Sequence, residues 1–224
     1  MKSATLVLSG TNSNIVGTYV RGGTLSAGST NAFGSGYLVT DNVAGVSVDL
    51  NGFNTNASYL AGGGTTGGNI DLGNGTLTVT NGSTAATATY AGAITGTGTG
   101  GFVKNGANIE YLSGGASTYT GSTTIGTLAA TGGMLEVYVL ADGGMASSIG
   151  ASSNAASNLV LNNGTLQYLG MGNTTDRLFT LGPSSTLDAS GAGAVQFTNT
   201  GAVAFSGPAN SAQVVAITGS STAN

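Results

Sequence analysis

The chain contains no cysteine, no histidine and no tryptophan, and only two of its 224 residues are proline. Without cysteine, the chain has neither a disulfide framework nor a thiolate metal site. Without histidine, the common Ser-His-Asp triad has no base. Because Lys2 and Lys104 lie in no recognisable catalytic motif, we set serine-type hydrolysis aside.

Charged residues are also scarce, at 5% of the chain against about a quarter in an average protein. The four basic residues are spread over the whole length, whereas a protein that neutralises phosphates needs several of them close together. We therefore expect no nucleic-acid partner. The eight acidic residues give a net charge of −4 without forming an acidic block.

Long hydrophobic runs are missing as well, since no run approaches the roughly 20 residues of a membrane helix. The apolar run that follows Met1-Lys2-Ser3 is too short for the h-region of a signal peptide. We expect either that a targeting segment has been removed or that the chain is a piece of a longer protein.

Glycine is abundant, at 41 residues, and hydrophobic residues make up 40% of the chain. Most of the remainder is Thr, Ser and Asn, a composition that favours short strands and turns over helices. Alternating apolar residues bounded by glycine or asparagine occur at residues 46–50, 76–80, 135–139 and 159–161. A weak helical candidate at residues 141–156 is disfavoured by its three glycines.

Two similar phrases occur in the two halves of the chain, at residues 8–25 and 112–128. Both begin with Leu-Ser-Gly and end with Gly-Thr-Leu, and the Gly-Thr-Leu triplet recurs at residues 75–77 and 164–166. These spacings are compatible with multiples of a coil of roughly 20 residues. Short repeated units of this kind are typical of a solenoid, in which each coil stacks on the coil before it.

The predicted architecture is an all-β parallel β-solenoid of about ten coils. We expect one continuous domain over residues 1–224, built of two tandem halves at about 1–107 and 108–224. The glycine-rich residues 96–101 are interpreted as a wide turn inside the stack. The aliphatic residues expected to point inward are Leu25, Leu50, Leu77, Val79, Leu128, Leu135, Val137, Leu161, Leu166 and Leu187.

Residues 101–106 (Gly-Phe-Val-Lys-Asn-Gly), 112–128 and 158–166 resemble the passenger-associated transport repeat of giant secreted bacterial proteins. This repeat is also called the autotransporter-associated β-strand repeat. The first half resembles it through residues 22–28 and 49–53, so that the likeness covers most of residues 1–207. The resemblance implies a right-handed parallel β-helix on the bacterial cell surface. It implies roles in adhesion, surface coating or passenger export, and no catalytic residues.

The chain departs from this repeat in two respects. Glu110 stands where the repeat has an inward leucine, and a buried unpaired carboxylate is costly. We therefore expect a bulge or register shift that turns Glu110 outward. In addition, the many strands of a translocator barrel are missing before Asn224, and we expect that these residues do not encode export by autotransport.

A glycan-degrading β-helix is an alternative, and it requires paired carboxylates or a calcium site near a basic residue. Asp176-Arg177 is interpreted as a solvated turn pair, and Asp41 and Asp142 as turn formers. The only candidates for such a site are Asp41 with Asp49, Asp71, and the trio Asp176, Arg177 and Asp188.

Two glycine motifs are set aside. Gly96, Gly98 and Gly101 match G-x-G-x-x-G, but no helix follows them to complete a phosphate site. Residues 142–144 (Asp-Gly-Gly) are too short for a calcium-binding repeat array. We predict no catalytic, cofactor-binding or metal-binding residue, and no cofactor.

Binding functions remain as alternatives. Threonine alternation at residues 76–80, 87–89 and 95–99 resembles an ice-binding array, although the irregular spacing favours ordinary exposed strand positions. Tyrosine side chains are able to stack on sugars, but we expect them to cover coil edges with their hydroxyls in water. The eight tyrosines are Tyr19, Tyr37, Tyr59, Tyr90, Tyr111, Tyr119, Tyr138 and Tyr168.

Neither end of the chain contains a convincing cap, because residues 5–9 and 213–217 are both strand-like. Unpaired strand edges at the ends of a stack must be covered. We expect the partner to be either a neighbouring solenoid segment of a longer chain or a second copy stacked end to end into a fibre. Low surface charge favours the fibre, and surface glycans are a further candidate partner. The predicted function is a non-catalytic extracellular structural or adhesive solenoid.

Overall fold

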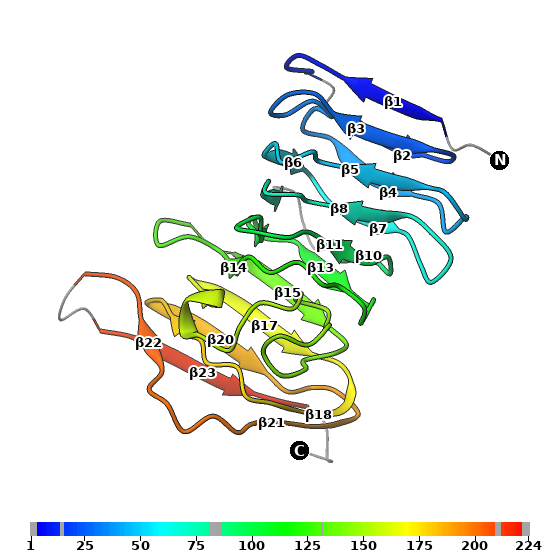
Figure 1. Cartoon of the computed structure of the whole chain (residues 1–224). Coiled ribbons are helices and arrows are strands. Elements are labelled where there is room, and N and C mark those ends of the chain that lie inside the picture. Colours follow the sequence, from blue (N-terminus) through cyan, green and yellow to red (C-terminus); the bar gives the residue numbers. More distant parts are fainter. Residues whose placement is uncertain (1–3, 14–15, 81–86, 131, 209–211, 221–224) are drawn as a thin grey trace.

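The computed structural model describes residues 4–13, 16–80, 87–130, 132–208 and 212–220. These residues form 23 strands and one short 3-10 helix, η1 (Ala156–Asn158). The strands pair in parallel from one coil to the next. They build an elongated stack with β1 and β23 at opposite ends (Figure 1). The prediction of an all-β parallel β-solenoid is confirmed, with about nine turns.

Three parallel sheets form the walls of the solenoid. Sheet A contains β1 (Thr5–Leu8), β3 (Thr24–Ala27), β5 (Ser47–Asp49), β8 (Asn69–Asp71) and β11 (Ile94–Thr95). Sheet B contains β2 (Gly17–Val20), β4 (Tyr37–Thr40), β7 (Leu60–Gly62), β10 (Thr87–Tyr90), β13 (Ile109–Leu112), β15 (Gly133–Val137), β17 (Gly164–Tyr168), β20 (Ser184–Asp188) and β23 (Val214–Thr218). Sheet C contains β6 (Thr55–Ala57), β9 (Leu77–Val79), β12 (Phe102–Lys104), β14 (Thr123–Ile125), β16 (Leu159–Leu161), β19 (Thr180–Leu181) and β22 (Ala204–Phe205).

A separate two-stranded sheet, β18 (Met171–Thr175) with β21 (Gly193–Phe197), lies in the last coils. In the central coils the chain passes from sheet A to sheet C and then to sheet B, as in β8, β9 and β10. Residues 96–101 connect β11 to β12 within one such coil, as the interpretation of a wide turn requires. The division into two halves near residue 107 remains a prediction.

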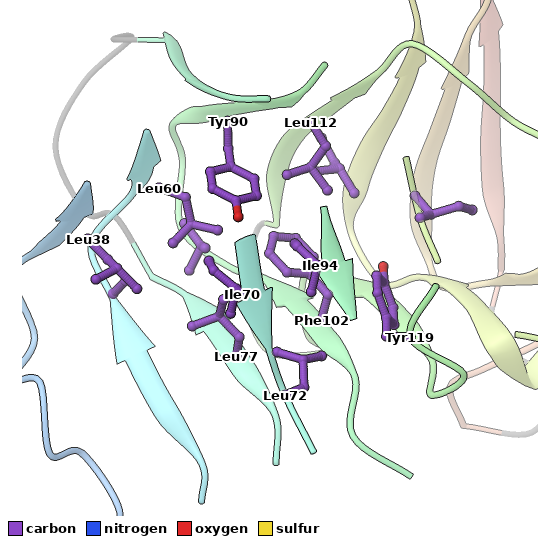
Figure 2. Close-up of a cluster of buried hydrophobic side chains, with 14 of the residues drawn as sticks. Leu38, Leu60, Ile70, Leu72, Leu77, Tyr90, Ile94, Phe102, Leu112 and Tyr119 are labelled. Carbon is purple, nitrogen blue, oxygen red and sulfur yellow. The ribbon is translucent and has the colours of Figure 1, made fainter. Parts of the chain in front are cut away.

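Inward side chains of successive coils stack into columns along the axis. In sheet A, Val48, Ile70 and Ile94 occupy equivalent positions and are fully buried. Figure 2 shows Ile70, Ile94 and Phe102 gathered with other apolar side chains in the interior. Such columns follow from period-2 alternation in strands that pair in register at about 4.8 Å. Each coil therefore buries its apolar side chains against the adjacent coils and against the other walls of the stack.

Most of the predicted inward residues are confirmed. Eight of the ten are buried, and Leu187 is partly buried against the core. Leu128 is the exception, because it is 49% exposed. The physical reason is that β14 ends at Ile125 and Gly126 turns the chain outward with a φ of 78°. Leu128 consequently lies in a loop, although it belongs to the repeated Gly-Thr-Leu phrase.

The repeated phrase does not mark one position of the coil. Gly23-Thr24-Leu25 leads into sheet A, Gly75-Thr76-Leu77 into sheet C and Gly164-Thr165-Leu166 into sheet B. The coils therefore differ in length. The register between coils is set by the parallel pairing of strands and not by the position of the Gly-Thr-Leu triplet. Among the described residues, no helix is long enough and apolar enough to span a membrane.

Candidate functional site

Three tyrosines of the first coils form a row on the outer face of sheet B, which we call the tyrosine ladder (Tyr19, Tyr37 and Tyr59). The ring centroids of Tyr19 and Tyr37 are 5.1 Å apart in an edge-to-face arrangement. Those of Tyr37 and Tyr59 are 5.3 Å apart and stacked. Tyr19 is 53% exposed, and its two partners are half-buried. The ladder therefore presents a continuous aromatic surface to the solvent.

Strand alternation and one glycine position these rings. Leu38 and Leu60 point inward, so that the residues before them, Tyr37 and Tyr59, point outward. Gly17 pairs with Tyr37, and a Cβ atom at Gly17 would lie 2.1 Å from the tyrosine ring. The absence of a side chain at Gly17 thus allows the ring of Tyr37 to lie flat against β2.

The hydroxyls of Tyr37 and Tyr59 stay neutral. A hydrogen bond to the Tyr19 side chain, followed by burial, raises the pKa of Tyr37 above its ordinary value. Burial raises the pKa of Tyr59 in the same direction. At physiological pH these phenols therefore donate and accept hydrogen bonds without carrying charge.

Arg21, directly after β2, extends the ladder. Its guanidinium carbon lies 5.4 Å from the ring centroid of Tyr19, within the range of a cation–π contact. The side chain is exposed. Asp41 follows the paired strand β4, yet no described carboxylate forms an ion pair with Arg21. The ladder therefore ends in an uncompensated positive charge.

The acidic residues considered for a glycan-degrading site cap turns instead. Asp49 and Asp71 are register partners on β5 and β8. The carboxylate of Asp49 accepts a hydrogen bond from the backbone N–H of Asn51 at 2.7 Å. The carboxylate of Asp71 accepts one from the backbone N–H of Gly73 at 2.9 Å. Asp188 accepts one from the hydroxyl of Ser190. The described residues contain no cluster of three or more acidic residues that could hold a metal ion.

Arg177 is buried, with only 1% of its side chain exposed, so the interpretation as a solvated turn residue is wrong. Its guanidinium enters the loop that connects β15 to η1. There Nε donates to the carbonyl of Ala141 at 2.9 Å, Nη1 to the Oγ of Ser152 at 2.9 Å, and Nη2 to the carbonyl of Gly150 at 2.9 Å. Arg177 therefore holds together an irregular loop in which the described β pairing is a single antiparallel bridge between Ser147 and Ser117.

The rim of this loop is held by Asp176. Its carboxylate accepts hydrogen bonds from the backbone N–H of Gly143 at 2.7 Å and from the amide of Asn154 at 2.8 Å. These bonds lower the pKa of Asp176. The carboxylate of Asp142 in turn accepts from the backbone N–H of Asp176 at 2.8 Å. The carboxylates of Asp142 and Asp176 thus both serve to fasten the loop to the next coil.

Glu110 is fully buried, so the predicted outward rotation is wrong. It occupies a column between Ala88 and Leu135 in sheet B. The reason is strand parity: Leu112 must point inward, and Glu110 lies two residues before it on the same strand. One carboxyl oxygen accepts a hydrogen bond from the backbone N–H of Leu60 at 3.3 Å. The other has no hydrogen-bond partner among the described residues.

Lys104 is a second buried charge, with no exposed side-chain area. It lies in the column of sheet C between Val79 and Ile125. Its ammonium donates to the carbonyls of Asn105 at 2.8 Å and Gly106 at 3.0 Å. Burial lowers the pKa of Lys104 to about 8, against the opposing influence of Glu110. The sequence analysis missed this position, although the spacing of Lys104 from buried Phe102 indicates an inward direction.

Three tyrosines also contradict the expectation of exposed, wet hydroxyls. Tyr90, Tyr119 and Tyr168 are almost completely buried. Their hydroxyls bond to protein groups: Tyr90 to the carbonyl of Gly68 at 2.7 Å, and Tyr119 to the hydroxyl of Thr123 at 2.6 Å. These tyrosines are part of the core.

The threonine alternation does not produce a flat array in the described strands. Thr78 lies between Asn56 and Val103 in adjacent coils. Likewise, Thr87 and Thr89 pair with Ile109 and Tyr111, and Thr95 pairs with Asp71. An ice-binding surface requires like residues to be superposed, and these columns are mixed.

The sequence matches a known adhesin. The chain is 50% identical over 222 residues to the adhesin BmaC autotransporter of Brucella suis biovar 1 (strain 1330). The match covers 98% of this chain, which spans only 6% of the length of the adhesin. No protein-family model matches the chain, and no solved structure matches it. The predicted resemblance to autotransporter passengers is confirmed: nearly the whole chain, a parallel β-solenoid, is similar to a segment of an autotransporter adhesin.

Proposed function

We propose that this chain is a non-catalytic, adhesive segment of a β-solenoid at the bacterial cell surface. The observation that carries the proposal is the combination of a parallel coil stack with 50% identity to a segment of an autotransporter adhesin. A stack of this kind exposes long outer sheet faces, which provide an extended surface for binding.

The roles of the polar residues support a binding function over catalysis. The paired carboxylates Asp49 and Asp71 are engaged in turns. Arg177 is enclosed by a loop, and both Lys104 and Glu110 lie inside the coil stack without access to a substrate. The tyrosine ladder and the exposed Arg21, which forms no ion pair with a described carboxylate, suit recognition.

The adhesive function can be tested with beads that carry the purified, folded chain and are incubated with cultured epithelial cells. We expect the beads to attach, and we expect beads carrying the urea-unfolded, chemically fixed chain to attach far less. Attachment that is equal for both preparations, or absent for the folded chain, contradicts adhesion by the solenoid.

We further propose that each end coil packs against another coil, from a neighbouring passenger segment or from a second copy. Two features support this contact. Leu6 at one end and Ile217 at the other are 60% and 72% exposed. An apolar cavity of about 160 Å³ lies beside Ile217, lined in part by Val195 and Phe197. A further coil would cover these groups and pair with the open strand edges.

The isolated chain is expected to associate end to end as its concentration rises. Analytical ultracentrifugation measures this association, and electron microscopy shows whether the particles lengthen along the solenoid axis. Ile217→Lys places a charge in the contact and is expected to reduce association, whereas Thr165→Lys on the side of sheet B is not. A chain that stays monomeric at high concentration contradicts stacking of copies.

A further inference from the structure

We propose that the tyrosine ladder and Arg21 together form a binding site for an acidic sugar chain. This inference rests on the proposed adhesive function and names the class of ligand for it.

The ladder runs along the axis of the solenoid. Its members come from successive coils: Tyr37 and Tyr59 precede the register partners Leu38 and Leu60, and their ring centroids are 5.3 Å apart. Tyr19 lies diagonally to Tyr37, because Gly17 is the register partner of Tyr37, and their ring centroids are 5.1 Å apart. A ligand that contacts all three rings must therefore be extended and must lie across the strands of sheet B. An unbranched stretch of a polysaccharide has this shape.

The exposed chemistry of the ladder is polar. Tyr37 and Tyr59 stack on one another, and the guanidinium of Arg21 covers a face of Tyr19. Ring edges and hydroxyls consequently remain for a ligand. Because the pKa values of Tyr37 and Tyr59 are raised, these hydroxyls are neutral hydrogen-bonding groups. They match the hydroxyl groups of a sugar chain better than they match an apolar ligand.

The charge of the site selects an anion. Arg21 is exposed and forms no ion pair within the described part of the chain. A guanidinium binds a carboxylate or sulfate through two parallel hydrogen bonds. The net charge of the chain is −4, so binding of an anion depends on this local cation. Asp41 lies in the adjacent coil, where its backbone N–H donates to the carbonyl of Val20 at 3.0 Å, and it forms no ion pair with Arg21.

The test compares hyaluronate oligosaccharides with the same oligosaccharides after reduction of their carboxyl groups, which makes them neutral. We expect the folded chain to bind the acidic form at least about tenfold more tightly, the effect of one charge-assisted contact. Arg21→Gln is expected to lose about the same factor. Asp41→Asn is expected to strengthen binding, because it removes a nearby negative charge that repels an anionic ligand.

Tyr37→Phe removes one ladder hydroxyl and is expected to weaken binding several-fold. Tyr138→Phe is the matched control, since Tyr138 is exposed but lies outside the ladder. Circular dichroism confirms that each variant is folded. Equal binding of acidic and neutral oligosaccharides, or unchanged binding by Arg21→Gln, overturns the inference.

Cell attachment separates this inference from the function on which it rests. If beads attach to cells but the chain binds neither oligosaccharide, the sugar site is wrong and the adhesive function stands. If beads do not attach, the adhesive function is wrong, whatever the oligosaccharides do.

Discussion

Arg177→Met is expected to lower the free energy of unfolding by about 4 kcal/mol, an unusually large loss for one substitution. Arg177 is only 1% exposed, and its guanidinium donates hydrogen bonds to Ala141, Gly150 and Ser152 of the loop. Methionine fills much of the volume but donates nothing, so these buried acceptors lose their partner. Each unsatisfied buried group costs about 1–3 kcal/mol.

Denaturant unfolding measures the overall loss, and hydrogen exchange locates it. We expect amide protection to fall first in residues 141–152, because these residues depend on Arg177 more than on strand pairing. Arg21→Met makes the same chemical change at an exposed site and serves as the control. Equal losses for the two variants, or unchanged protection of the loop, would show that the guanidinium does not hold it.

Glu110→Gln is expected to stabilise the chain at neutral pH and to remove a pH dependence. Burial raises the pKa of Glu110 well above its ordinary value, and the Leu60 N–H and Lys104 offset this only in part. The unfolded chain ionises this carboxyl near pH 4.5, whereas the folded chain keeps it protonated to a higher pH. The contribution of the Glu110 carboxyl to the free energy of unfolding is therefore fully present below pH 4.5. Above this pH it declines by about 1.4 kcal/mol per pH unit until the raised pKa of the folded chain is reached.

The measurement is denaturant unfolding of both proteins between pH 4.5 and 7.5. Glutamine keeps an acceptor for the Leu60 N–H but does not ionise. The free energy of unfolding of Glu110→Gln is therefore expected to exceed that of the wild type by an amount that grows with pH across this range. Lys104 titrates in the folded chain only at about pH 8 and does not disturb the interval. Glu136→Gln is the matched control, because Glu136 is only partly buried. If the free energies of unfolding of the wild type and Glu110→Gln differ by the same amount at every pH in this range, the proton linkage is excluded.

Glu110 and Arg177 are both predicted at the surface from the sequence, and both are buried. The prediction for Glu110 rests on the cost of a buried unpaired carboxylate, and the prediction for Arg177 rests on its place in a solvated turn pair. For Glu110, Leu112 on the same strand faces inward, and the alternation of the strand places the carboxyl on the same side. For Arg177, the cost is offset by carbonyls of a loop that precedes it by more than twenty residues. Only the folded chain brings those acceptors to the guanidinium.

The tyrosine ladder could not be predicted for a related reason. Tyr19, Tyr37 and Tyr59 are not equally spaced, and the coils differ in length, so their alignment depends on how β2, β4 and β7 pair. By the same rule, the repeated phrase predicted Leu128 to be inside, although Gly126 directs the chain out of the strand. The alternation of apolar and polar residues predicts which face a strand buries, but it does not predict where each coil ends.

The amino-acid sequence by itself determined the class of this protein. Alternating aliphatics, abundant glycine and the lack of charge allow short parallel strands that bury a narrow core, and residues such as Val79 and Leu161 were placed correctly from local alternation alone. Tertiary structure decided the rest: which coils superpose, which polar groups are enclosed and which tyrosines meet at the surface. These properties depend on contacts between residues distant along the chain, and a periodicity within one strand carries no information about them.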